Sequence, residues 1–350
     1  MGPRVEKFEG EFAAYCGASH GIAFPSCTSA LETALSALGA GHGDEILVPV
    51  QTFIATGMSV HAAGARPVFT EIRPDTMAMD FDDAWSRVTE RTRGAIVVHF
   101  GGLIAPGFPE FVNRMQSTGR FVIEDAAHAH GAELEGAGAG SMGDAGCFSF
   151  YSTKTMTTGE GGMLVTSRED VAHISRSLQN RGLDLNHEGE LYSIPGRNNR
   201  FTEIAASMGL SQLRTLPGFL EARRLVASTY DRILAETEVF QPIDPGYGCA
   251  PSYWRYSVTP SFPIDRTKLK ERLAADRINI DWPYDPPLHL QPVFQTLYET
   301  RLGMLPISEE AMSRHICLPI HARMREIDAE HVINRLLHHF AELSGAESRT

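Results

Sequence analysis

The chain has 350 residues, 43% of them hydrophobic and 21% charged, which is an ordinary globular composition and long enough for two domains. Acidic residues outnumber basic ones by 43 to 31, and the formal net charge of −12 argues against a nucleic-acid partner. The charged amino-terminal residues and the lack of any long apolar run argue against a signal peptide and a membrane span.

Short apolar runs alternate with helical patterns from the start of the chain to about residue 170. These runs cover residues 21–24, 45–50, 66–72, 94–100 and 120–126. Each is nearly continuously apolar, as in strands covered on both faces, and this predicts an α/β fold with a mainly parallel sheet between helices. Two further runs, 145–151 and 161–167, lie too close together for a helical crossover, so we expect an antiparallel return and a mixed sheet.

A mostly helical segment follows from about residue 202 to 236, and Pro217 and Gly218 predict a break in it at 216–219. Proline, glycine and tyrosine cluster after this segment. We therefore divide the chain into a large domain, 1–236, and a smaller carboxyl-terminal α+β domain, 237–350. The smaller domain should contain a strand near 254–260 and helices near 267–275 and 328–340.

Hydroxyl side chains follow the first apolar run, where a strand gives way to a helix. Thr28 and Ser29, next to Ser26, stand where free backbone N–H groups and hydroxyls together make a phosphate site. Helix capping explains the same residues nearly as well. Phe53 follows the second run and could stack on a flat ring, although a phenylalanine is more often part of the core.

A carboxylate and a lysine follow two later strand candidates. Asp125 ends one of them, where it can face the crevice at the carboxyl end of the sheet or else cap a helix. Glu124 should point to the opposite face. Lys154 follows the run that contains Ser149, and a buried amine there could act as a Schiff-base nucleophile, although it could equally be a solvated surface lysine. Ser149 could supply another hydroxyl or simply be polar on its strand.

Other site types find little support. His128 and His130 lie two residues apart rather than four, so we expect no metal. There is no P-loop, and G-E-G-G at 159–162 lacks the spacing of a dinucleotide loop. The five cysteines are widely spaced without a C-x-x-C pair, which favours reduced thiols and a cytoplasmic protein.

Taken together, the segments resemble the DegT/DnrJ/EryC1/StrS family of pyridoxal-5′-phosphate (PLP) dependent sugar aminotransferases, which have the aspartate aminotransferase fold, fold type I. The ordered segments that carry this resemblance are GPRVEKFEGEFAAYCGA, SCTSALETAL, GDEILVPVQTFIAT, GARPVFTEI, VIEDAAHAHGA, GDAGCFSFYSTKTMTTGEGGMLVT, GRNNRFTEIAASMGLSQL and CLPIH. Together they extend over nearly the whole chain.

The resemblance implies a role for each candidate residue. Lys154 would hold PLP covalently and carry the proton, Asp125 would face the pyridine nitrogen, and Phe53 would stack on the ring. The phosphate would be held by Thr28, Ser29 and Ser149. Asn198, within the pattern Gly196, Asn198, Arg200, would reach the phosphate of a neighbouring subunit, which implies a homodimer with shared active sites.

Three features depart from the family pattern. His128 stands where glutamine is usual, and it could still bond the phenolic oxygen of the cofactor. Cys27 stands where glycine usually precedes the threonine. The chain also begins later than family members do, so the segment that helps to cover their active site is absent or the start was assigned too late.

The resemblance implies a ping-pong transfer of an amino group from glutamate or glutamine to a keto sugar, typically nucleotide-linked. A keto-cyclitol is another acceptor used in the family. The family's sugar dehydratases replace the lysine with histidine, so Lys154 argues against that chemistry. A non-catalytic PLP-binding sensor or regulatory protein remains the rival from another class.

Overall fold

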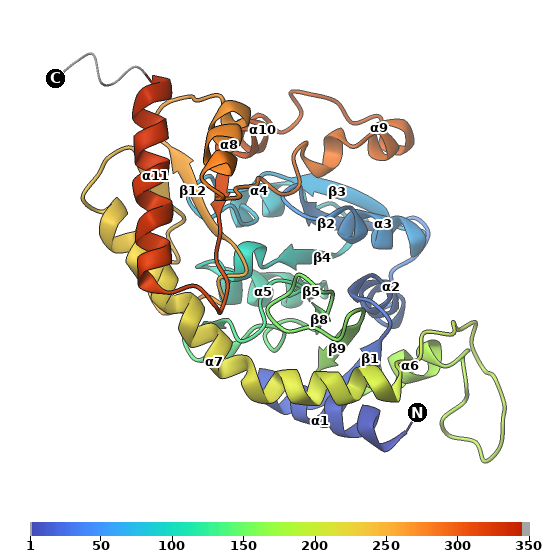
Figure 1. Ribbon diagram of the computed structural model, residues 1–350. Coiled ribbons are helices and arrows are strands. Elements are labelled where there is room, and N and C mark those ends of the chain that lie inside the picture. Colours follow the sequence, from blue (N-terminus) through green and yellow to red (C-terminus); the bar gives the residue numbers. More distant parts are fainter. Residues whose placement is uncertain (1, 345–350) are drawn as a thin grey trace.

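The computed structural model describes residues 2–344. A seven-stranded sheet forms its centre, in the order β1-β9-β8-β5-β4-β2-β3 (Figure 1). The strands are β1 (His20–Phe24), β2 (Glu45–Pro49), β3 (Arg66–Thr70), β4 (Thr92–Val98), β5 (Phe121–Asp125), β8 (Ala145–Ser149) and β9 (Gly162–Thr166). Only β9 runs against its neighbours, β1 and β8, and the other pairs are parallel. The predicted mixed, mainly parallel sheet is confirmed.

Helices cover both faces of this sheet, and strands such as β2 and β5 are therefore buried on both sides. One hydrophobic core joins the sheet to α1 (Pro3–Cys16), α4 (Phe81–Ser86), α5 (Phe108–Gln116) and the first part of α7 (Glu203–Leu234). The other core joins the opposite face to α2 (Cys27–Ala37), α3 (Ile54–Ala62), α6 (Glu169–Gln179), α9 (Pro292–Tyr298) and α10 (Pro306–Arg314).

The carboxyl-terminal part has its own core around a small antiparallel sheet. This sheet has the order β10-β12-β13, formed by β10 (Phe240–Pro242), β12 (Tyr256–Pro260) and β13 (Ile316–Leu318). Its core includes α8 (Arg266–Ala275), α11 (Glu326–Ser344) and the last part of α7. A second small sheet joins β11 (Cys249–Ala250) to β6 (Glu133–Leu134) and β7 (Ala137–Gly138). The domain boundary near residue 237 stays a prediction.

The predicted break at residues 216–219 is wrong, because α7 continues through Pro217 as one helix of 32 residues. Leu216 and Leu220 are buried on either side of the proline, and α7 packs against both α1 and α11. Proline removes one backbone hydrogen bond from a helix. Packing along the whole length of α7 outweighs that loss.

In the part of the chain that the structure describes, no helix combines the length and the apolar character needed to cross a bilayer.

Candidate active site

A cavity of about 430 Å³ lies where β2, β4, β5 and β8 end. Parallel strands end at one edge of a sheet, so side chains that follow different strands meet there. Six of the residues expected from the sequence line this cavity: Thr28, Phe53, Asp125, His128, Ser149 and Lys154. The structure therefore brings together residues that lie far apart in the sequence.

The amino end of α2 forms one wall of the cavity. Ser26 caps this helix, because its Oγ accepts a hydrogen bond of 3.1 Å from the backbone N–H of Ser29. The hydroxyl groups of Ser26 and Ser29 also lie 3.1 Å apart, and Ser29 is not among the lining residues. A Cβ on Gly162 would lie 2.3 Å from the backbone of Ser26, so only glycine lets β9 approach this turn so closely. Thr28 and the start of the helix face the cavity as a ready anion site.

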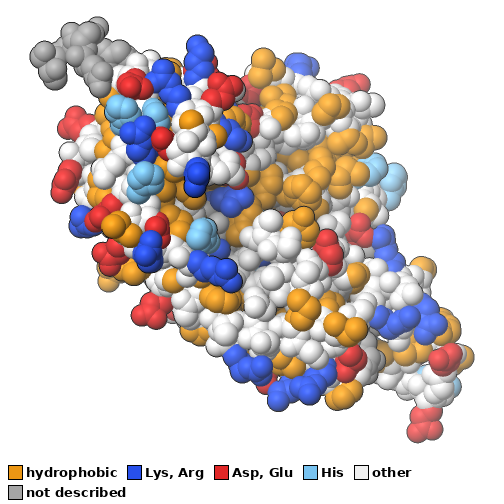
Figure 2. Space-filling view, viewed as in Figure 1, with side chains coloured by type: hydrophobic (Ala, Val, Ile, Leu, Met, Phe, Trp, Pro, Cys, Tyr) orange, Lys and Arg blue, Asp and Glu red, His pale blue; other side chains and the backbone are white. Residues whose placement is uncertain are grey.

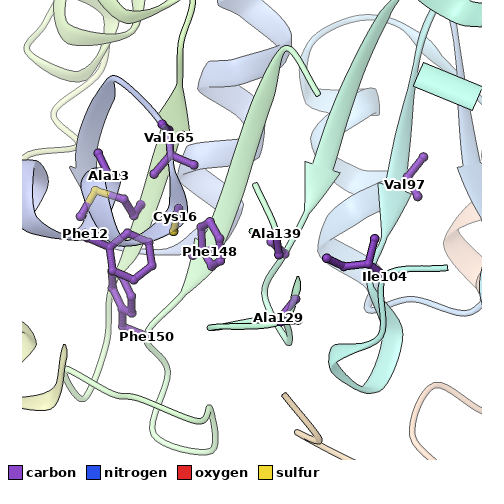
Figure 3. Close-up of a cluster of buried hydrophobic side chains, with 14 of the residues drawn as sticks. Phe12, Ala13, Cys16, Val97, Ile104, Ala129, Ala139, Phe148, Phe150 and Val165 are labelled. Atoms are coloured by element: carbon purple, nitrogen blue, oxygen red, sulfur yellow. The ribbon is translucent and has the colours of Figure 1, made fainter. Parts of the chain in front are cut away.

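The alternation of side chains along β8 directs Ser149 into the cavity. Phe148 and the next residue but one, Phe150, pack on Phe12 of α1, with ring centres 4.9 Å and 5.2 Å from it (Figure 3). Because neighbouring side chains of a strand point to opposite faces, Ser149 points away from this cluster and lines the cavity. The segment F-S-F thus anchors the strand that leads to Lys154.

Lys154 is not a solvated surface lysine. Its Nζ lies 4.3 Å from the centre of the Trp254 ring, and its backbone N–H donates to the carbonyl of Tyr151 over 3.0 Å. Burial lowers the pKa of this amine to about 8, although the negative charge of Asp125 opposes the shift. A larger share of the side chain is therefore the neutral, nucleophilic amine at neutral pH than for an ordinary lysine.

Asp125 is buried in the same cavity. Its Oδ2 accepts from the Thr56 hydroxyl at 2.8 Å and its Oδ1 from the backbone N–H of Ala127 at 3.2 Å. Burial raises the pKa of Asp125, and these hydrogen bonds and Lys154 oppose the shift. No helix begins directly after Asp125, so helix capping does not explain it. Among the described residues no ion pair within 4.0 Å joins Asp125 to Lys154.

Glu124 points to the other face of the sheet, as expected for its neighbour. It is fully buried there, and its carboxylate accepts backbone N–H groups of Gly140, Met142 and Gly143 at 2.7 to 2.8 Å. The ring Nε2 of His99 lies 2.8 Å from the same carboxylate. The Glu124 carboxylate therefore holds the loop at residues 140–143 in place and does not line the cavity.

Two aromatic side chains, Phe53 and Tyr284, lie next to each other in the wall of the cavity. Phe53 precedes α3 and is 56% exposed, so it is not part of the core. Its ring centre lies 6.1 Å from that of Tyr284. An exposed aromatic ring at a cavity wall can cover the face of a flat ligand.

His128 is buried between two other rings. It stacks on Trp254 with ring centres 3.7 Å apart, and its Nε2 lies 2.9 Å from the Tyr284 hydroxyl. Burial and the nearby positive charges of Lys154 and Arg255 lower the pKa of His128 well below its usual value. The imidazole is therefore neutral at pH 7.

Sequence reasoning missed the contribution of the carboxyl-terminal part. Trp254, Arg255 and Tyr284 line the cavity from this part of the chain. The residues WRY at the start of the strand candidate 254–260 were the only local signal. Nothing in the sequence pattern indicated that they would pack beside Lys154.

Asn198 does not line this cavity. It is exposed and forms an isolated β-bridge with Asn180, while Arg200 donates to the Asn180 side chain over 3.0 Å. The expected contact of Asn198 with a neighbouring subunit stays a prediction.

Comparison with known proteins finds sequences that are similar to this chain over nearly its whole length. The sequence pattern of the DegT/DnrJ/EryC1/StrS aminotransferase family matches residues 1–337. The chain is 36% identical to the GDP-perosamine synthase of Caulobacter vibrioides over 339 residues, 96% of this chain and 90% of that protein. It is 34% identical to the UDP-N-acetyl-3-dehydro-alpha-D-glucosamine 3-aminotransferase of Acidithiobacillus ferrooxidans over 346 residues, 97% and 90% of the two chains.

A solved structure also matches closely. The PLP form of the putative sugar aminotransferase Spr1654 from Streptococcus pneumoniae superimposes with a TM-score of 0.89 at 25% identity. The superposition covers 96% of this chain and 91% of that one. The fold of the two chains is therefore the same.

Proposed function

Since the chain belongs to the DegT/DnrJ/EryC1/StrS aminotransferase family and is thus an aminotransferase, we propose that it moves an amino group from glutamate or glutamine to a nucleotide-linked ketosugar, with PLP as its cofactor. The names of the two relatives, a GDP-linked and a UDP-linked sugar enzyme, support this class of acceptor. The observation that carries the proposal is a buried amine with a lowered pKa, Lys154, which shares one cavity with the buried carboxylate of Asp125.

The residues of the cavity fit PLP. Lys154 would bind its aldehyde, Asp125 would face its pyridine nitrogen, and Phe53 would cover one face of its ring. Its phosphate would lie at the start of α2, against Thr28 and the Ser149 hydroxyl. When bound, PLP supplies an aldehyde that condenses with amines and a pyridinium ring that withdraws electrons.

Asp125 and Lys154 would have different roles in the reaction. The carboxylate of Asp125 would lie near the ring nitrogen, where a negative charge would favour the protonated form of that nitrogen. Its hydrogen bonds from Thr56 and Ala127 hold the carboxylate in place. As a free, neutral amine, the Lys154 side chain would act as the base, and its Nζ would take the proton from the donor's α-carbon.

Ser29 and Asn198 complete the proposed phosphate site less directly. Ser29 would act through the Ser26 hydroxyl, to which it is hydrogen-bonded. Asn198 would approach the phosphate of a neighbouring subunit, so we propose a homodimer with shared active sites. His128 would remain a cofactor-binding residue next to Tyr284. The five cysteines are free thiols, which supports a cytoplasmic location.

The test is a spectral and chemical assay of the purified protein. With PLP bound, glutamate or glutamine should change the absorption of the cofactor and release the corresponding keto acid. A screen of nucleotide-linked ketosugars and keto-cyclitols, with mass detection of the amine product, then identifies the acceptor. A protein that only senses PLP would show no turnover, and the Lys154→Ala variant would then have no activity to lose.

A further inference from the structure

Three side chains of the kinds that bind metal ions meet on one face of α11. They are His338, His339 and Glu342, and their ligand atoms all lie within 4.8 Å of one another. Glu342 follows the two histidines by four and three residues, and residues with these spacings are neighbours on the surface of a helix. Figure 2 shows histidine side chains, in pale blue, over α11. None of the three residues lines the cavity that contains Lys154.

The distances within this group fit a single metal ion. The carboxylate oxygens of Glu342 lie 3.3 Å from Nε2 of His338 and 3.5 Å from Nδ1 of His339. Zn²⁺ binds imidazole nitrogens and carboxylate oxygens at about 2.0 to 2.2 Å in a tetrahedron, so two of its ligand atoms lie about 3.4 Å apart. The three side chains therefore already stand at the spacing that such an ion requires.

The buried histidine of the group has one ring nitrogen without a partner. His339 is 8% exposed, and its Nδ1 makes no hydrogen bond to any described residue. Its Nε2 lies 2.7 Å from Oδ2 of Asp276, the residue after α8, and 3.1 Å from a terminal nitrogen of Arg335. The carboxylate makes the shorter contact and only accepts, so the proton lies on Nε2 and Nδ1 carries a lone pair.

This lone pair has an acceptor opposite it. Nδ1 of His339 and the Glu342 carboxylate lie 3.5 Å apart, and two acceptors that face each other without a donor are unfavourable. A metal ion between them would be bound by both. Asp276 would then have the role of the carboxylates that hold the far nitrogen of metal-binding histidines, fix the orientation of the ring and make it more basic.

The positive charges near the group are already paired. Arg272 of α8 pairs with Glu342, and Arg335 pairs with Asp276 at 2.7 Å. These two arginines and two carboxylates carry no net charge together, so they do not repel a divalent cation as a set. They also join the group to α8, which shares a hydrophobic core with α11.

We propose that His338, His339 and Glu342 bind one divalent transition-metal ion of the zinc type, which fastens the last turns of α11 to α8. Imidazole ligands select Zn²⁺ and similar ions over Mg²⁺ and Ca²⁺, which take oxygen ligands. The expectation of no metal concerned His128 and His130, whose spacing differs from that of this group. The inference goes beyond the proposed function and does not depend on it.

The experiment titrates Zn²⁺ into the PLP-loaded protein by calorimetry, in a buffer without phosphate or chelators. The wild type should bind one ion per chain at this site, and its melting temperature should rise with the Zn²⁺ concentration. His338→Gln removes an exposed ligand and should weaken binding about tenfold or more. His331→Gln is the matched control, because His331 is an exposed histidine of the same helix outside the group, and it should bind Zn²⁺ like the wild type.

A further variant tests the carboxylate behind His339. Asp276→Asn keeps an oxygen that can accept from Nε2 but removes the charge, so the affinity for Zn²⁺ should fall about tenfold. Its melting temperature without Zn²⁺ reports whether it still folds.

The outcomes decide the inference without any measurement of turnover. Weaker binding by His338→Gln, together with unchanged binding by His331→Gln, supports the site. A wild type that binds no Zn²⁺, or a His338→Gln variant with the affinity of the wild type, overturns it. Displacement of Zn²⁺ by an equal concentration of Mg²⁺ also overturns it, since that result indicates oxygen ligands alone. Failure of the proposed aminotransferase reaction would change none of these results.

Discussion

The hydroxyl group of Tyr284 lies 2.9 Å from Nε2 of His128, a residue 156 positions earlier in the chain. The His128 ring is neutral, so only one of its nitrogens carries a proton. Its Nδ1 is buried without a partner in the described structure. We therefore infer that the proton lies on Nε2, which donates to the Tyr284 oxygen and leaves the tyrosine O–H free to donate into the cavity.

The first prediction follows from this direction of the hydrogen bond. Tyr284→Phe removes both the acceptor for His128 and the donor to the cavity, so PLP should bind about tenfold more weakly. His128→Gln keeps a side-chain N–H that can donate to Tyr284, so it should retain most of the affinity. Fluorescence titration of the apoprotein with PLP measures both. Equal losses in the two variants would contradict the inferred direction.

The second prediction concerns the pH dependence of Lys154. Its pKa of about 8 lies below the usual value for lysine, so the reactive neutral amine forms at lower pH than on an ordinary lysine side chain. The rate at which the apoprotein combines with PLP should rise as the pH increases toward 8 and level off above it. Stopped-flow absorption measures this rate, and borohydride reduction followed by peptide mass analysis identifies the labelled residue. Labelling of another lysine would refute the assignment, and Lys154→Arg should show no labelling.

The third prediction concerns the carboxylate of Asp125. Asp125→Asn keeps the size of the side chain but removes its charge. We expect kcat to fall about a hundredfold or more, which is comparable to the loss of rate when a general acid or base is removed. Thr56→Val removes one hydrogen bond to that carboxylate and should have a smaller effect, whereas Thr56→Ser should stay near wild type. Steady-state kinetics with glutamate measures all three. An Asp125→Asn enzyme with unchanged kcat would remove Asp125 from the proposed mechanism.

The sheet, and the site residues that follow its strands, could be predicted from local patterns in the sequence. The strands before Asp125 and Lys154 are continuous apolar runs, and the end of such a strand places its next polar residue at the cavity edge. Trp254 and Tyr284 could not be placed in this way. They reach the cavity through contacts between distant segments, which no local period encodes.

The fourth prediction tests the structural role of Glu124. Its fully buried carboxylate accepts hydrogen bonds from three backbone N–H groups, and Nε2 of the His99 ring lies 2.8 Å from it. Glu124→Gln places an NH₂ group against N–H donors, so the free energy of unfolding should fall by about 3 kcal/mol. Urea unfolding measures this loss. A variant as stable as the wild type would show that the loop at residues 140–143 does not depend on the carboxylate.

The fifth prediction uses α7, where packing overrides a proline. Gly218 lies next to Pro217, and the space that an alanine Cβ would occupy there is open, so Gly218→Ala should stabilise the protein by about 0.5 to 1 kcal/mol. Gly209 is the matched control in the same helix, because a Cβ there would lie 2.6 Å from the Phe8 ring and Gly209→Ala should destabilise.

Pro217→Ala restores the backbone N–H donor that proline lacks. It should raise the free energy of unfolding by more than Gly218→Ala does, by up to about 3 kcal/mol. Melting temperatures of the three variants, measured with PLP present, rank these effects. The predicted order depends on α7 being one continuous helix that is buried against α1 and α11. If α7 were broken at residue 217, alanine there would add little stability, and Pro217→Ala would have the same melting temperature as the wild type.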